Sequence, residues 1–264
     1  MILDPQLCTG CGLCLKICPG QAISLVDRNS LPLPPGDAGG NGSDAPAPDG
    51  VKLSKRVALI DEGLCFECGA CLRSAVCHFD AFREEDSLPW PRSMRKILSD
   101  PLTMFEDTRI TGRGTEEMKT NDVAGRFVEG ELGVAIDVGR PNVGTYMRDV
   151  DTIASALAKL GVRFAKENPV TALMDIDTGH LSEEVLNERV ISAIIEFFIK
   201  PQQLPEVIEV LREVGKKIDT VFSVGVISKV NTEEGGAQFL QEVRGLGVEP
   251  LANVKTNIGL GRAK

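Results

Sequence analysis

The chain has 264 residues, of which 42% are hydrophobic and 25% charged, a composition typical of a globular protein that can bury a core. Its 29 Lys and Arg against 38 Asp and Glu give a net charge of −9, which argues against nucleic acid or an anionic membrane as a partner. No run of 18 apolar residues predicts a membrane span, and the first ten residues lack the pattern of a signal peptide, so we expect a cytoplasmic location.

The cysteines are confined to the first third of the sequence. All eight precede residue 78, and residues 78–264 contain none. In a reducing cytoplasm, such clustering indicates metal ligation rather than a disulfide framework. The first four are Cys8, Cys11, Cys14 and Cys18, and the second four are Cys65, Cys68, Cys71 and Cys77.

The segments around the cysteines alternate between short apolar runs and loop-forming stretches. Residues 22–26 form an apolar run, and residues 29–50 hold five Pro and five Gly, which predicts a solvated insertion. Residues 56–61 predict a short strand. We expect residues 84–130 to be an irregular linker with one short helix at 93–98.

From residue 131 onward, strands and helices are expected to alternate. The predicted strands cover 131–139, 168–177, 190–199, 220–230 and 248–260, and the predicted helices cover 149–161, 204–218 and 236–247. The order β-α-β-β-α-β with an added α-β predicts an α+β sandwich of the split βαβ type. This half resembles ACT-like domains at the level of fold alone. The expected domains are therefore 1–83, a linker at 84–130, and 131–264.

The spacing C-x2-C-x2-C-x3-C-P, from Cys8 to Pro19, carries the strongest chemical signal. A 4Fe–4S cluster is held by four cysteine thiolates, and three cysteines at intervals of three can wrap a loop around one cluster. Cys65, Cys68 and Cys71 repeat that loop. Gly12 and Gly69 follow the middle cysteine of each loop, where glycine allows a close approach of the backbone.

Residues 1–27 and 56–83 resemble the bacterial two-cluster 4Fe–4S ferredoxins. The resemblance implies two 4Fe–4S clusters and low-potential electron transfer to a partner oxidoreductase, as in anaerobic metabolism. It also implies one ligand set for each cluster. These sets are Cys8, Cys11, Cys14 and Cys77 for the first cluster, and Cys65, Cys68, Cys71 and Cys18 for the second.

The second motif departs from the family pattern. Five residues separate Cys71 from Cys77 instead of three, and His78 stands where the family has proline. We expect a two-residue bulge within residues 73–76, and His78 to tune or ligate the first cluster or simply to meet solvent. Zinc, disulfides and a 3Fe cluster are the other readings of the cysteines, and the spacing favours none of them.

The second half carries weaker signals. The possible anion contacts are Arg113, Lys119 and Arg140. The alternative is that Arg113 and Lys119 belong to a polar linker and that Arg140 lies in the connection before a capped helix. Asp149 or Asp151 is expected to cap that helix. Asp175 and Asp177 form either an acid–base pair or a solvated face, and His180 is expected in a polar loop.

Three functions remain open on this evidence. The first is an electron-transfer subunit whose C-terminal domain docks a partner or forms a homodimer. The second is a redox enzyme with an anionic substrate bound between the domains. The third is a regulator that senses a ligand through the ACT-like half.

Overall fold

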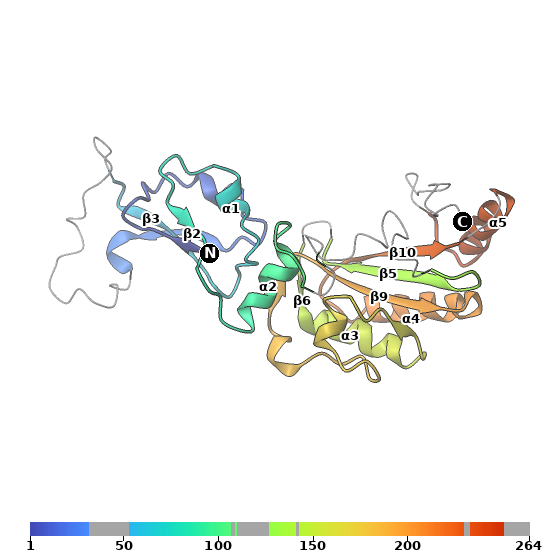
Figure 1. The fold of residues 1–264 in the computed structure, drawn as a ribbon. Helices are drawn as coiled ribbons and strands as arrows, with labels where there is room; N and C mark the ends of the chain where they lie inside the picture. The colour runs from blue at the N-terminus through green and yellow to red at the C-terminus, as the bar shows by residue number, and fades with distance from the viewer. Residues whose placement is uncertain (32–52, 107–108, 110–126, 141–142, 230–232, 251–264) are drawn as a thin grey trace. The chain divides into compact units, whose positions relative to one another are not determined.

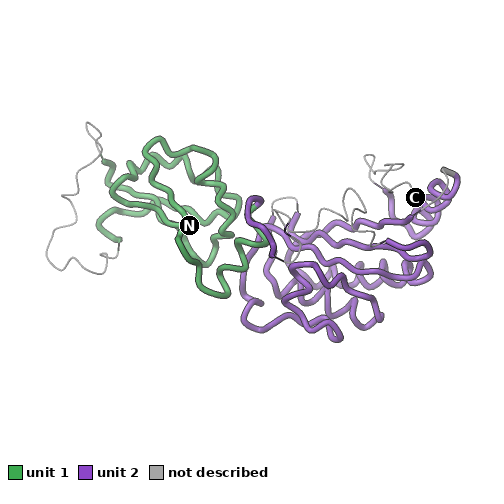
Figure 2. The backbone as a smooth tube through the Cα atoms, viewed as in Figure 1, with its two compact units in different colours: residues 1–100 green, residues 101–264 purple. Residues whose placement is uncertain are grey.

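The computed structural model describes residues 1–31, 53–106, 109, 127–140, 143–229 and 233–250 (Figure 1). The chain forms two compact units, Met1–Asp100 and Pro101–Lys264 (Figure 2). The first unit extends past residue 83, because helix α2 (Arg92–Ser99) belongs to it and buries Met94 and Leu98. None of the helices in the described ranges is long and apolar enough to cross a membrane.

The first unit contains two small antiparallel sheets. Strand β1 (Ile2–Leu3) pairs with β4 (Phe82–Arg83), and β2 (Ile23–Asp27) pairs with β3 (Arg56–Ile60). Each sheet therefore joins a strand near the first cysteine run to one near the second. The remaining elements of this unit are the 3-10 helices Leu13–Lys16 (η1) and Arg28–Ser30 (η2), and the helices α1 (Ala70–Arg73) and α2.

The core of the first unit is built around the cysteines themselves. Cys8 and Cys14 are buried together with Val57, Ala58 and Phe82. The predicted strand at 56–61 and the short helix at 93–98 are both confirmed, as β3 and α2. The Pro- and Gly-rich insertion lies almost entirely outside the described residues.

The second unit contains a four-stranded sheet in the order β10-β5-β9-β7, and every neighbouring pair is antiparallel. Its strands are β5 (Leu132–Val138), β7 (Arg163–Phe164), β9 (Ala193–Ile199) and β10 (Phe222–Ser228). Strands β6 (Thr145–Tyr146) and β8 (Arg189–Val190) form a separate pair. The other elements are α3 (Met147–Ala158), α4 (Leu204–Gly215), α5 (Glu233–Gly245), and the 3-10 helices Thr171–Leu173, Glu183–Val185 and Pro201–Gln203.

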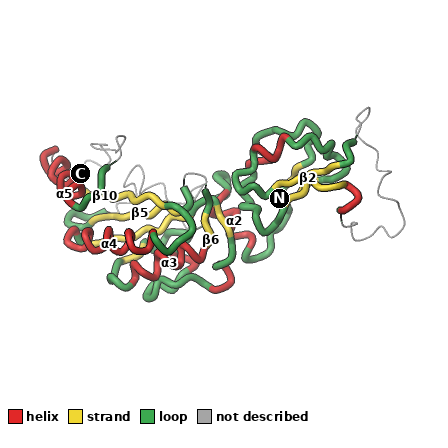
Figure 3. Tube along the Cα trace, turned by 180° about the vertical axis from the view of Figure 1, so that it is seen from behind, coloured by secondary structure: helices red, strands yellow, loops and turns green. Residues whose placement is uncertain are grey.

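Helices α3 and α4 pack against each other and lie along one face of this sheet (Figures 1 and 3). They bury apolar residues at helical spacing, among them Ile153 on α3 and Leu211 on α4. All seven residues of β9 are buried, as expected for a strand with neighbours on both sides. Residues Ala193–Ile199, which are all apolar except Glu196, thus form a central strand of the sheet.

The predicted strand at 168–177 is wrong. The Asn168 side-chain oxygen accepts hydrogen bonds from the backbone N–H groups of Val170 and Thr171, which starts a 3-10 turn instead of a strand. The second strand of the sheet is the two-residue β7. The other predicted helices and strands of this half are confirmed, except the strand at 248–260, which lies largely outside the described residues.

Candidate metal centre

Strand pairing brings the end of each cysteine motif beside the start of the other. The Asp4 N–H donates to the Ala81 carbonyl at 2.7 Å, and the Asp61 N–H donates to the Ala22 carbonyl at 2.8 Å. Each aspartate lies four residues before the first cysteine of a motif, and each alanine lies four residues after the last. The two connections repeat the same local geometry, so the two halves of this unit have equivalent arrangements at these positions.

Two pockets result from this exchange of motif ends. The first pocket is lined by Cys8, Cys11, Cys14 and Cys77, and the second by Cys18, Cys65, Cys68 and Cys71. These are the same two groups of four that the ferredoxin resemblance implies. The pockets enclose similar empty volumes, about 330 and 360 Å³, counting space open to solvent. Among the described residues, no group of three or more Cys, His, Asp or Glu converges closely enough to hold a single metal ion.

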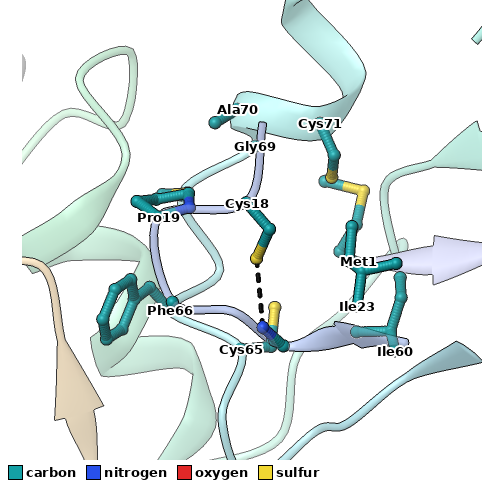
Figure 4. A pocket seen from close by; sticks show the side chains of 13 residues that line it. Met1, Cys18, Pro19, Ile23, Ile60, Cys65, Phe66, Gly69, Ala70 and Cys71 are labelled. Atoms are coloured by element: carbon teal, nitrogen blue, oxygen red, sulfur yellow. Dashed lines mark hydrogen bonds between the residues drawn. The ribbon is translucent and has the colours of Figure 1, made fainter. Parts of the chain in front are cut away.

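Apolar side chains form most of the pocket walls. Figure 4 shows the second pocket, where Met1, Ile23, Ile60 and Phe66 surround the cysteines. The first pocket has Leu3, Leu13, Ala58 and Phe82 in corresponding roles. Such walls exclude water from a bound group and lower the local dielectric constant around it.

Backbone N–H groups donate hydrogen bonds to cysteine sulfurs in both pockets. The Ala22 N–H donates to Cys18 Sγ at 3.2 Å, the dashed line in Figure 4, and the Ala81 N–H donates to Cys77 Sγ at 3.4 Å. The N–H groups of Ala58 and Glu67 donate to Cys8 and Cys65 Sγ, each at 3.4 Å. Hydrogen bonds of this kind stabilise the charged thiolate form and tune any iron held by it.

The loop glycines have a backbone reason for being there. Gly12 has φ +77° and Gly69 has φ +66°, a left-handed conformation that other residues rarely adopt. A side chain on Gly12 would meet Leu25, and one on Gly69 would collide with the Arg73 guanidinium. The left-handed φ values account for glycine at both positions, and the atoms nearest to an added Cβ belong to the side chains of Leu25 and Arg73.

The buried thiols favour the protonated form in the absence of a cation. Burial raises the pKa of Cys14 and Cys65 to about 11 and that of Cys71 to about 12, and it also raises the pKa of Cys68. Neighbouring cysteines add to the effect at Cys14 and Cys71, because two thiolates repel each other. Only a strongly cationic ligand offsets these costs, which suits iron bound by thiolates.

The extra residues before Cys77 are used to brace the second pocket. Arg73, at the end of α1, donates a hydrogen bond to the Cys68 carbonyl and pairs with buried Asp100 at 2.9 Å. Ala75, in the same segment, has φ +49°. His78 is exposed and does not line the first pocket.

One acidic residue inside the second loop was not predicted. The Glu67 carboxylate is 2% exposed, lies 2.5 Å from the Met1 amine and lies 2.6 Å from Arg92 of α2. Burial alone would raise the pKa of Glu67, but hydrogen bonds from Met1 and Arg92 outweigh it and hold the pKa below its usual value. The signal for this residue was its position between Cys65 and Cys68.

Of the three predicted anion contacts, only Arg140 falls within the described residues, and it lines neither pocket. Arg113 and Lys119 lie outside the described residues. Arg140 is half-exposed, and its Nε lies 3.9 Å from the carboxylate of Asp137. Among the described residues, the charged neighbour of Arg140 is thus an acidic group.

The acidic residues near α3 have local roles that differ from those expected. Neither Asp149 nor Asp151 caps α3, whose N-cap residue is Tyr146. Asp151 instead accepts a hydrogen bond from the Leu181 N–H at 2.7 Å and lies 3.2 Å from exposed His180. Asp175 accepts hydrogen bonds from the N–H groups of Thr178 and Asp177 in a turn, which lowers the pKa of its carboxyl.

Comparison with known families supports the sequence resemblance. Residues 7–81 match the model of the 4Fe-4S dicluster domain family. No curated protein and no solved structure matches the chain. Residues 7–81 therefore form a ferredoxin-type segment, and this match supports 4Fe–4S clusters and an iron–sulfur electron-transfer role for that segment.

Proposed function

We propose that this ferredoxin-type segment binds two 4Fe–4S clusters and passes single electrons to a partner oxidoreductase. Cys8, Cys11, Cys14 and Cys77 hold the first cluster, and Cys18, Cys65, Cys68 and Cys71 hold the second. The observation that carries this proposal is the presence of two pockets of similar volume, each lined by four cysteines. Four thiolates are the ligand set that one such cluster requires.

The fit extends beyond the ligand count. Each pocket has apolar walls and backbone N–H donors on its sulfurs, and neither has a charged side chain in its lining. A bound cluster supplies reversible one-electron chemistry, and the protein holds it, orients it and keeps water away.

The first pocket is the better site for exchange with a partner. Cys11 of the first pocket is exposed, although Cys8 and Cys14 are buried, whereas the cysteines of the second pocket are all partly buried. Leu13 lines the first pocket and is 44% exposed, and Ile17 is 36% exposed on the same 3-10 turn. An apolar, accessible edge allows a partner protein to approach the cluster and exclude water between them.

The experiment that tests this function uses anaerobically purified full-length protein. Two clusters predict about eight iron and about eight acid-labile sulfide per chain. The reduced protein should then pass electrons one at a time to an artificial one-electron acceptor without any substrate. About four irons per chain would reject the two-cluster assignment, and no electron transfer by a fully loaded protein would reject the carrier role.

For the second unit we propose a split βαβ arrangement that docks the partner or forms a homodimer. The support is the sheet order, in which β9 lies between β5 and β7, the two strands that flank α3. Sedimentation of the full chain tests the dimer. Saturable binding of an anionic small molecule to the full chain would instead favour the enzyme or the regulator.

A further inference from the structure

Two arginines contact the cysteine loops in the same way, one at each pocket. Arg28, in η2, donates from Nη1 to the Pro5 carbonyl at 2.5 Å and from Nη2 to the Cys8 carbonyl at 2.6 Å. Its Nε also donates to the Ser54 carbonyl at 3.3 Å. The guanidinium therefore joins the first cysteine of the first loop to the residue three positions before it.

Arg95 makes the corresponding contacts at the second loop. Its Nη1 donates to the Glu62 carbonyl at 2.6 Å and to the Cys65 carbonyl at 2.8 Å. Cys65 corresponds to Cys8, and Glu62 precedes it by three positions, as Pro5 precedes Cys8. Both loops are thus held by a guanidinium at equivalent carbonyl groups.

The two arginines reach these equivalent places from unrelated parts of the chain. Arg28 follows β2, ten residues after Cys18, whereas Arg95 lies on α2, eighteen residues after Cys77. Helix α2 also lies beyond the segment that matches the dicluster family model. Repetition of one contact by two unrelated elements indicates a shared requirement of the loops rather than an inherited sequence feature.

We propose that Arg28 and Arg95 are matched positioning residues, each of which holds one cysteine loop and places a permanent positive charge beside it, so that each raises the reduction potential of one cluster. The proposal rests on the proposed two-cluster function. Reduction adds one electron and therefore one negative charge to a cluster, and a nearby cation stabilises that charge. Because a guanidinium does not lose its proton in proteins, its effect is independent of pH.

The two arginines differ in burial, which predicts effects of different size. Arg95 is 7% exposed, whereas Arg28 is partly exposed at the surface. Water and salt screen an exposed charge more strongly than a buried one. We therefore expect loss of Arg95 to shift the second cluster further than loss of Arg28 shifts the first.

The test compares Arg28→Gln with Arg95→Gln in the full-length, cluster-loaded protein. A redox titration followed by electron paramagnetic resonance gives a reduction potential for each cluster. The single variants Cys11→Ala and Cys68→Ala assign the signals, since each removes a ligand of a different pocket. Arg28→Lys and Arg95→Lys keep the charge but lose the paired donation to two carbonyls.

The expected result is a selective decrease. Arg95→Gln should lower the equilibrium constant for reduction of the second cluster on the order of tenfold. That change corresponds to a decrease of about 59 mV in its one-electron reduction potential, and the potential of the first cluster should not change. Arg28→Gln should lower only the reduction potential of the first cluster, and by a smaller amount. The Lys variants should recover most of either shift.

Unchanged potentials in both Gln variants would overturn the proposal, as would equal shifts of both clusters in each variant. Reduction potentials in the Lys variants as low as those in the Gln variants would also overturn it, because the positive charge would then have no effect. If a Gln variant fails to hold its clusters, the corresponding Lys variant and the other arginine still decide the outcome. Eight irons with unaltered potentials would reject this role while leaving the two-cluster function intact.

Discussion

The exchange of Cys18 and Cys77 between the two motifs predicts an unusual pattern of cluster loss. The change is a pair of double variants, Cys14→Ala with Cys18→Ala, and Cys14→Ala with Cys77→Ala. In the structure, Cys14 and Cys18 line different pockets although only three residues separate them, whereas Cys14 and Cys77 line the same pocket.

The size of the effect follows from the pocket that each cysteine lines. Cys14→Ala with Cys18→Ala removes one ligand from each pocket, so iron should fall from about eight atoms per chain to nearly none. Cys14→Ala with Cys77→Ala removes two ligands from one pocket, so about four irons should remain. The single variants are the controls, and each should also retain about four.

The assay is iron and acid-labile sulfide per chain in anaerobically purified protein, with circular dichroism to verify that the chain is folded. Pairing by neighbouring sequence, with Cys8 to Cys18 around one cluster, predicts the opposite result for the two double variants. Four irons in the Cys14/Cys18 variant and none in the Cys14/Cys77 variant would refute the reasoning.

Three further substitutions test the packing and electrostatics. Phe197→Ala empties a fully buried site beside Phe164 and should cost about 3–5 kcal/mol of unfolding free energy in urea titrations. Gly12→Ala places a side chain against Leu25 on a residue with left-handed φ and should cost about 1–2 kcal/mol of unfolding free energy. The measurement is the loss of cluster absorbance under anaerobic conditions, which should occur at a lower denaturant concentration than in the unaltered protein. Burial raises the pKa of Asp149 above 3.8, so its charge destabilises the fold at neutral pH. Asp149→Asn should raise the melting temperature at pH 7, and this gain should vanish as the pH falls below 3.8; a constant gain would contradict the assignment.

The sequence predicted most of the second unit because its apolar patterns are long and regular. The apolar residues on both sides of Glu196 predicted a buried strand, and the helical spacing of Ile153 and its neighbours predicted the helix α3. The strand predicted at 168–177 is wrong, because turn chemistry decides the local structure there. Asn168 and Asp175 each bond to backbone N–H groups just ahead of them, and such local bonds compete with a strand.

At the metal centre, the cysteines and loop glycines could be predicted because their spacing is a property of the sequence. Arg28 and Arg95 could not be predicted in the same way, and the only signal for Glu67 was its position between Cys65 and Cys68. Arg95 reaches Cys65 only because α2 packs within the first unit, and nothing in the residues around it distinguishes it from Lys96, which pairs with Glu84 at the surface. Contacts made across 30 residues of sequence depend on the fold as a whole.

A reductive titration of the anaerobically purified, full-length protein tests the central claim most directly. Two clusters that each accept one electron predict an uptake of about two electrons per chain, with a separate magnetic signal from each cluster. The reduced protein should return both electrons to a one-electron acceptor with no substrate present. Uptake of a single electron, or of none by protein that carries its full iron, would contradict the account.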